Sequence, residues 1–380
     1  MRKLSILDLI LTDYTLRIVS LGSALLGIIS GVLGSFAVIR KESLLGDAVS
    51  HSALPGIALA FLMTQTKRTE ILLLGALISG LLSTFIIISI VKYSRIKFDS
   101  ALALILSVFF GGGIVLLTYI QKIPNANQAG LEKFIFGQAS TLLKRDVQVM
   151  GILGIVLITL TIIFWKEFKI VSFDAEYAES LGFSTKGITT LLFAMVVTAI
   201  IIGLQTVGVI LMSAMLTAPA VAARQWTDKL SAMVILSAIF GAISGVIGTI
   251  LSSVVSKLPT GPMIVIVIST IVIISLGFAP NRGLIWKYFR DRKKQREINE
   301  DQVLVNLYRL AMNHEDINHS HDIFIIKPNK STTGKAAREL TNKLESLGSR
   351  GLAKKDYFNK WAITEKGFEY VENYFKKEEL

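Results

Sequence analysis

Two side chains that can bind a metal ion lie four residues apart within one long apolar run. Asp47 is the only carboxylate inside such a run, and His51 is the only histidine before position 314. On a helix, a spacing of four places both side chains on one face. An ionisable group in a membrane segment is costly and therefore marks a candidate functional site. Imidazole with carboxylate suits manganese, zinc or iron, so the pair predicts a site for a divalent transition metal.

This pair is incomplete as a metal site in one copy of the chain. A cation that takes about four to six ligands needs more from another copy of the same helix, from water or from backbone oxygens. A dimer with the site on its axis would supply them. Pro55 lacks an amide hydrogen, so it frees the carbonyl oxygen of His51 or kinks the helix. The structural alternative is that Asp47 caps the helix and His51 only packs.

The elements that position this pair are membrane spans. Hydrophobic residues make up 52% of the 380 positions and charged residues 18%, with a mean hydropathy of +0.58, which soluble domains do not reach. A spanning helix needs about 20 apolar residues, and the runs are too long for barrel strands. We therefore expect an all-α polytopic membrane protein with eight or nine spans. The candidate spans are residues 15–39, 44–63, 71–90, 101–120, 147–165, 188–203, 207–223, 231–255 and 263–278.

The sixth and seventh runs are short, and only residues 204–206 separate them. They form either a tight hairpin of two spans or one broken element. Glycine pairs at a spacing of four predict close packing between other spans, because small residues let helices approach closely in lipid. The pairs are Gly27 with Gly31 and Gly241 with Gly245.

Charge divides the chain into parts. Residues 1–281 hold 20 basic and 13 acidic side chains, whereas the 99 residues 282–380 hold 20 and 15. This contrast predicts a transmembrane domain at 1–281, a basic juxtamembrane linker at 282–296 and a soluble domain at 297–380. The basic cluster directly after the last span places that domain on the cytoplasmic side of a multi-pass cell-membrane protein. The side of the N terminus stays open, because it depends on the number of spans.

The soluble domain has the pattern of a winged helix. Residues 297–312 and 333–347 predict two amphipathic helices, 351–355 and 360–363 a small hairpin, and 364–375 a final helix. Between the first two helices, NHEDINHSHD offers His314, His319 and His321 as a possible regulatory metal site. A solvated polar loop is the alternative reading of that segment.

Two cytoplasmic segments have the small, helical character of docking elements. One is FDAEYAESLGF at 173–183, and the other is LTAPAVAARQWTDKL at 216–230. In the second, Pro219 is expected to start a short helix that ends at Arg224, with Ala220, Ala222 and Ala223 forming a small face. Ordinary interfacial loops are the alternative for both.

Two absences limit the chemistry. Without cysteine, the chain has no disulfide, thiolate metal site or cysteine nucleophile. The phosphate-binding loop G-x-x-x-x-G-K-[ST] does not occur either. The chain therefore cannot bind ATP by that route, and an energised transporter of this kind would need a separate ATPase subunit. For such a transport subunit we expect no enzyme activity and no permanently bound cofactor.

Several motifs resemble the membrane permease subunits of bacterial ABC importers for manganese, zinc and iron, which are related more distantly to siderophore and cobalamin permeases. The most specific is GSFAVIRKESLLGDAVSHSALPGIALAFL at 34–62, which looks like the family signature LLGDAxSHxxLPG. Further matches are LEKFIFGQASTL, FDAEYAESLGF, VGVILMSAMLTAPAVAARQ and LPTGP. The resemblance covers residues 16–278.

This resemblance implies a dimeric permease that passes metal along its interface, with Asp47 and His51 in the place of the signature Asp and His. The segment from Pro219 to Arg224 is similar to the one that couples to the ATPase. The implied partners are that ATPase, an extracellular metal-binding protein, a second permease copy or a homologous permease subunit, and membrane lipid. The implied cargo is manganese first, then zinc or iron. The long tail departs from many permeases of this family.

Two rival functions remain at this stage. A membrane-anchored winged-helix regulator or metal sensor would use the spans only as an anchor, yet an intramembrane Asp and His exceed what an anchor needs. Nucleic acid is therefore not an expected partner. A proton-coupled secondary transporter would use Asp47 as a proton carrier and would need no ATPase.

Overall fold

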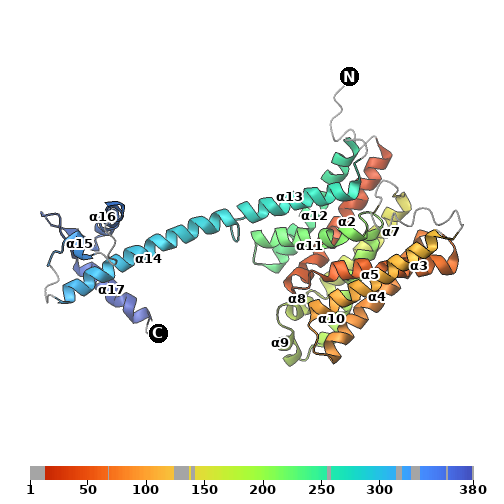
Figure 1. Ribbon diagram of the computed structural model, residues 1–380, viewed down its shortest axis with the longest axis horizontal. Helices are drawn as coiled ribbons and strands as arrows, with labels where there is room; N and C mark the ends of the chain where they lie inside the picture. Colours follow the sequence, from red (N-terminus) through yellow and green to blue (C-terminus); the bar gives the residue numbers. More distant parts are fainter. Residues whose placement is uncertain are drawn as a thin grey trace, which may run out of the picture. The chain divides into compact units, whose positions relative to one another are not determined.

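The computed structural model describes residues 13–66, 68–123, 137, 142–254, 258–313, 319–326, 334–356 and 358–378. It divides into two compact units, Met1–Leu284 and Ile285–Leu380. Helices α2 to α13 belong to the first unit (Figure 1). Helix α14 begins at Leu284, so all but its first residue belongs to the second unit.

Helices build the first unit throughout its described residues. Eight of them are long and apolar enough to cross a membrane, which confirms the all-α polytopic class with eight or nine spans. The eight are α2 (Tyr14–Ile39), α3 (Leu45–Thr64), α4 (Thr69–Tyr93), α5 (Phe98–Gln121), α7 (Lys144–Ile163), α10 (Thr185–Leu204), α12 (Leu230–Val254) and α13 (Thr260–Phe278). The other helices are α8 (Trp165–Phe173), α9 (Ala175–Ser180) and α11 (Val209–Trp226).

The sixth and seventh apolar runs form two separate helices, α10 and α11, joined by a largely buried turn. Gly208 in this turn has a φ of 87°, which glycine adopts without steric cost. α10 packs mainly on α2 and α4, whereas α11 packs mainly on α2, α13 and α12. The two helices therefore diverge after the turn and do not form a tight hairpin.

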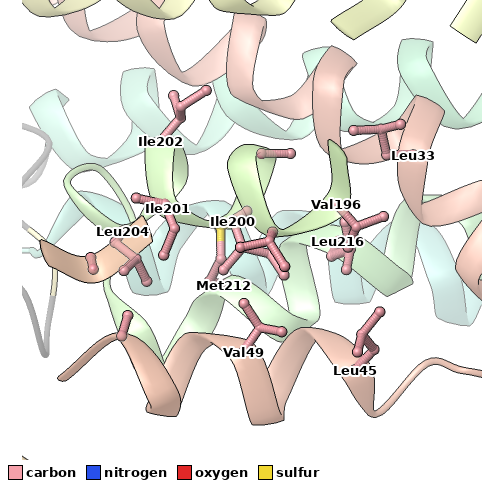
Figure 2. Packing of buried hydrophobic residues seen from close by; sticks show 14 of the residues in the cluster. Leu33, Leu45, Val49, Val196, Ile200, Ile201, Ile202, Leu204, Met212 and Leu216 are labelled. Atoms are coloured by element: carbon pink, nitrogen blue, oxygen red, sulfur yellow. The ribbon is translucent and has the colours of Figure 1, made fainter. Parts of the chain in front are cut away.

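The apolar core of the first unit lies where α2, α3, α10 and α11 meet. Val49 of α3 points toward Ile200 of α10 and Met212 of α11, and all three are fully buried (Figure 2). Burying such side chains stabilises a fold by about 1.5–3 kcal/mol each in water. In lipid the gain comes from packing instead, because the surrounding acyl chains are equally apolar. The core thus holds one side of α3 in a fixed place.

α2 and α12 approach each other at glycine. A Cβ on Gly27 would overlap the backbone of Gly241, and a Cβ on Gly31 would overlap the backbone of Ser237. The hydroxyl of Ser237 donates a hydrogen bond to the carbonyl oxygen of Gly31 at 2.8 Å. The predicted close packing at these glycines is therefore confirmed.

The second unit has its own small core. The strands β1 (Ala353–Lys355) and β2 (Trp361–Ile363) pair antiparallel, with Ala353 opposite Ile363. They pack with helices α14 (Leu284–Asn313), α16 (Gly334–Ser349) and α17 (Glu365–Glu378) through one buried cluster. The order helix, helix, hairpin, helix follows the order expected from the sequence, with α15 (Ile323–Ile326) as an additional short helix.

The basic segment expected as a linker is helical. α14 runs without interruption from Leu284 to Asn313, so it includes both the segment 284–296 and the helix expected at 297–312. The reason is compositional: this stretch contains no glycine or proline, and it is rich in Arg, Lys, Glu and Gln, which favour helix. The charge pattern led us to expect a linker, but it did not indicate whether that segment is helical.

We expect Gly241→Ala to destabilise the first unit, because the added methyl group must push α12 away from α2. Overpacking of this kind costs about 1–3 kcal/mol. Gly277→Ala in α13 is the matched control, since nothing lies within 4 Å of a Cβ placed there. Thermal unfolding of the purified protein in detergent measures both. Equal unfolding temperatures for the two variants would contradict the close α2–α12 contact.

Candidate functional site

Asp47 and His51 lie side by side near the start of α3. Nε2 of His51 is 3.4 Å from Oδ1 of Asp47. The Asp47 side chain is 38% exposed and that of His51 is 15% exposed. Leu44 occupies the N-cap position and no side chain caps the helix, so Asp47 is not the cap that the structural alternative required. The pair offers one imidazole nitrogen and two carboxylate oxygens at a single point on the helix.

Close contacts on two sides fix α3. A Cβ on Gly56 would overlap the carbonyl oxygen of Gly75 in α4, and one on Gly113 of α5 would press on Leu54 and Pro55. Pro55 lies inside α3, which continues through it. Because both neighbouring helices approach at glycine, α3 has little freedom to slide or rotate.

The turn before α3 is held by a charged side chain. Arg40 pairs with Glu42 through two hydrogen bonds of 2.8 and 3.0 Å. The guanidinium also lies 5.4 Å from the ring centroid of Phe193 in α10. Both partners of the ion pair are largely buried, and a buried, bidentate pair resists displacement better than an exposed one. The turn therefore fixes where α3 begins, two residues before Asp47.

Phe110 of α5 positions the ring of His51. The two rings meet edge to face, with centroids 4.6 Å apart and planes at 79°. Nδ1 of His51 is buried and has no hydrogen-bond partner among the described residues, which leaves Nε2 as the nitrogen beside Asp47. Sequence reasoning missed Phe110. Its only signal was its place directly before the glycine run 111–113.

The edge of α3 that carries the pair is open on the single chain. Asp47, His51, Pro55, Leu59 and Met63 follow one another at intervals of four, and none of them is buried. No group of three His, Asp or Glu side chains occurs among the described residues. Within this part of one chain, Asp47 and His51 are thus the two candidate ligand side chains, and Asp47 is the more exposed of them.

The segment expected to couple to an ATPase has a different structure from the one predicted. Pro219 does not start a helix but lies inside α11, which continues to Trp226. Pro219, Ala220, Ala222 and Ala223 are buried within the chain, so they cannot form a docking face. Small side chains such as alanine occur both on docking faces and on buried packing faces. The sequence alone therefore could not show which of the two this segment forms. Arg224 is partly exposed at the end of the helix.

The exposed part of this region is the turn from α11 to α12. Trp226, Asp228 and Lys229 are exposed there. The sequence placed them in the same segment but did not single them out, because exposure depends on where α11 ends. A partner that meets this turn would contact these three side chains and Arg224.

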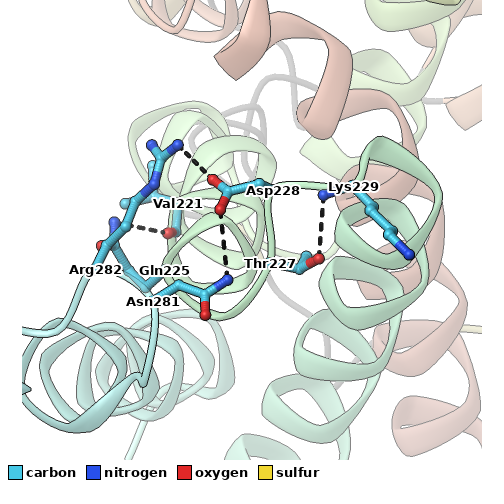
Figure 3. A network of polar contacts seen from close by, with 7 residues as sticks. All are labelled: Val221, Gln225, Thr227, Asp228, Lys229, Asn281 and Arg282. Atoms are coloured by element: carbon cyan, nitrogen blue, oxygen red, sulfur yellow. Dashed lines mark hydrogen bonds and ion pairs between the residues drawn. The ribbon is translucent and has the colours of Figure 1, made fainter. Parts of the chain in front are cut away.

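Hydrogen bonds link this turn to the end of α13. Arg282 donates a hydrogen bond to Oδ1 of Asp228 at 2.6 Å, and the Asn281 amide reaches Oδ2 at 3.5 Å (Figure 3). Trp226 Nε1 donates to the buried hydroxyl of Ser275 at 2.9 Å. The α11–α12 turn is thus tied to the end of α13 within the first unit.

The candidate regulatory histidines are partly described. His319 and His321 have ring centroids 5.0 Å apart. His321 is buried and its backbone exchanges hydrogen bonds with Trp361 at 2.8 and 2.9 Å, whereas His319 is exposed. The third member, His314, lies outside the described residues. The structure therefore brings two of the three together.

Among the described residues, eight helices are long and apolar enough to cross a membrane, and one of these eight, α3, carries an ionisable pair, which is the arrangement of a polytopic membrane protein. The model of the ABC 3 transport family matches residues 12–279. The chain belongs to this family. The match covers the described spans and ends before α14.

Individual relatives agree with this assignment. The zinc transport system membrane protein TroC of Treponema pallidum is 49% identical over 282 residues, 74% of this chain and 95% of that relative. The manganese transport system membrane protein MntC of Bacillus subtilis is 47% identical over 76% of this chain and 66% of that relative. The structure of PsaBC from Streptococcus pneumoniae in complex with Fab is similar with a TM-score of 0.65 and 29% identity, covering 76% of this chain and 98% of that one.

The chain is therefore a multi-pass permease subunit of an ABC transport system, and it is not itself an enzyme. ATP hydrolysis belongs to a separate subunit. The interpretation as a membrane-anchored regulator is not supported, because the family match lies in the spans. The interpretation as a proton-coupled transporter is likewise not supported, because the matched family is ATP-driven.

We expect Arg282→Asp and Asp228→Arg each to lower ATP-driven transport, because each puts two like charges in place of the Asp228–Arg282 ion pair. An exposed ion pair contributes only about 1 kcal/mol, or roughly fivefold, so the effect is moderate. The double swap restores the opposite charges and should recover most of the transport rate. Uptake assays at equal membrane levels measure all three. A double variant that transports no better than either single one, while the ATPase subunit still co-purifies in normal amount, would show that the ion pair has no role.

Proposed function

We propose that this permease passes a divalent transition metal, manganese or zinc, through a site that contains Asp47 and His51. The observation that carries the proposal is the pair itself, 3.4 Å apart on the open edge of a span held by glycine contacts. In a buried structural pair, all polar atoms would find their partners within the chain. This one leaves carboxylate oxygens exposed where a second molecule can reach them.

The chemistry of the pair sets the metal class. A neutral imidazole with a carboxylate binds manganese, zinc and iron, and it lacks the soft thiolate that favours copper(I). Two relatives carry the words zinc and manganese in their names. We place manganese first, then zinc or iron, with the ion as transported cargo and no permanently bound cofactor.

The same geometry supports a second permease subunit as partner. A pair of copies facing each other at the open edge of α3 would contribute two Asp47 and two His51 side chains, enough for a four-coordinate site. A homologous permease with the same motif would serve equally. An extracellular metal-binding protein would deliver the ion, and membrane lipid surrounds the remaining apolar surface.

The ATPase subunit is proposed to meet the α11–α12 turn. Arg224, Trp226, Asp228 and Lys229 form the exposed surface there, while Pro219, Ala220, Ala222 and Ala223 support it from inside. A charged rim around one large aromatic side chain is typical of protein interfaces.

Asp47→Ala and His51→Ala should each reduce uptake of manganese or zinc at least about tenfold, because each removes one ligand of the ion. Ser50→Ala is the matched control on the same helix, since its side chain is fully buried within the chain and its hydroxyl donates to the Gly46 carbonyl oxygen. Cells without their own copy of the permease, supplied with radioactive manganese, zinc or iron, provide the measurement. Normal uptake in either variant at equal membrane levels rejects the proposed pathway.

The second unit is proposed to adjust transport to cytosolic metal through His314, His319 and His321. His319→Ala tests this with least harm to the fold, because its side chain is exposed. We expect both this variant and deletion of residues 285–380 to change how uptake responds to metal preloaded into the cytosol. Ser320→Ala, between the two described histidines, is the control. Wild-type responses in the substitution and the deletion alike would remove the regulatory role.

A further inference from the structure

The start of α14 carries exposed apolar side chains on one side of the helix. Ile285, Trp286, Tyr288 and Phe289 are between 39% and 60% exposed, and Lys287 lies among them. We propose that this segment, residues 285–289, docks on the anionic headgroup surface of the membrane that holds the spans. The proposal does not depend on which ion is transported.

Aromatic identity is the first argument for lipid. Tryptophan and tyrosine prefer the membrane interface, where an apolar ring meets acyl chains and a polar atom meets water. Trp286 and Tyr288 are of this kind, and Phe289 contacts Tyr288 at a centroid distance of 6.1 Å. Left in water, four large exposed side chains in five residues would be a liability.

Charge is the second argument. Lys287, Arg290 and Lys294 follow one another at spacings of three and four in α14. Residues on one face of an amphipathic interfacial helix have this spacing. Between 285 and 296 the sequence holds six basic residues and one acidic residue. The cytoplasmic leaflet is anionic, so this composition complements it.

Continuity with the spans is the third argument. α13 ends at Phe278, seven residues before Ile285. Even fully extended, seven residues reach at most about 25 Å. Chain length alone therefore keeps the patch near the membrane surface, at a high effective concentration relative to lipid.

A second exposed apolar patch differs from the first in charge, so exposure alone does not determine which partner a patch binds. Phe173, Tyr177 and Leu181 are exposed around α9, and the residues between 173 and 183 include three acidic and no basic side chains. An anionic lipid surface would repel that patch. The two patches have opposite charge and are therefore suited to different partners, which supplies a matched internal control.

The absence of cysteine allows a direct test in the full chain. Tyr288→Cys and Tyr177→Cys each accept one environment-sensitive fluorophore at an exposed aromatic position. The labelled proteins are placed in lipid nanodiscs at one copy per disc, either with phosphatidylglycerol or with phosphatidylcholine alone. Lipids that carry a nitroxide at the headgroup then quench any label at the surface.

We expect the label at 288 to be quenched about threefold more in anionic discs than in zwitterionic discs, and the label at 177 to show no such difference. Adding Lys287→Glu and Lys294→Glu should remove the difference at 288. The pair Lys354→Glu and Lys355→Glu, both in strand β1 of the second unit, should leave the difference intact.

Three results would overturn the proposal. Equal quenching at 288 in both kinds of disc would mean that anionic lipid is not the partner. Shielding of the label from aqueous iodide that arises only on adding the ATPase subunit would assign the patch to that protein. Shielding that arises only in discs with two copies would assign it to a contact between permeases.

Discussion

Close approach of backbones at glycine is the constraint on which the first unit depends. Lipid gives helices no hydrophobic reason to associate, so stability must come from van der Waals contact and from internally satisfied polar groups. α2 meets α12 at Gly27 and Gly241, and α3 meets α4 at Gly56 and Gly75. Serine hydroxyls in these helices bond to backbone carbonyls, as Ser237 does to Gly31. The helices are thus held at distances that larger side chains would not permit.

Asp47 and His51, the proposed metal ligands, inherit their geometry from this packing. α3 is fixed by α4, by α5 and by the core, and Phe110 sets the ring of His51. Asp47 stays 38% exposed beside these contacts, and a symmetric partner at that edge would double the proposed ligand set.

The sequence predicted those features that follow from local spacing. The four-residue interval of Asp47 and His51 places both side chains on one helix face, and apolar length alone identified the spans. It could not predict features that depend on where a helix ends in three dimensions. Pro219 resembled a helix start, yet packing carries α11 through it to Trp226, and this continuation buries Ala222. Phe110 was equally hidden, since a phenylalanine in a span has no distinctive spacing.

Helix ends connect parts of the first unit that lie far apart in the sequence. α11 stops at Trp226 and α13 at Phe278, and both ends are joined through Ser275, Asp228 and Arg282. The turn after α13 is packed as closely as the helices are, because a side chain on Gly283 would strike the Ala279 carbonyl oxygen. Glycine thus sets the backbone geometry at this end of the unit as it does between the spans.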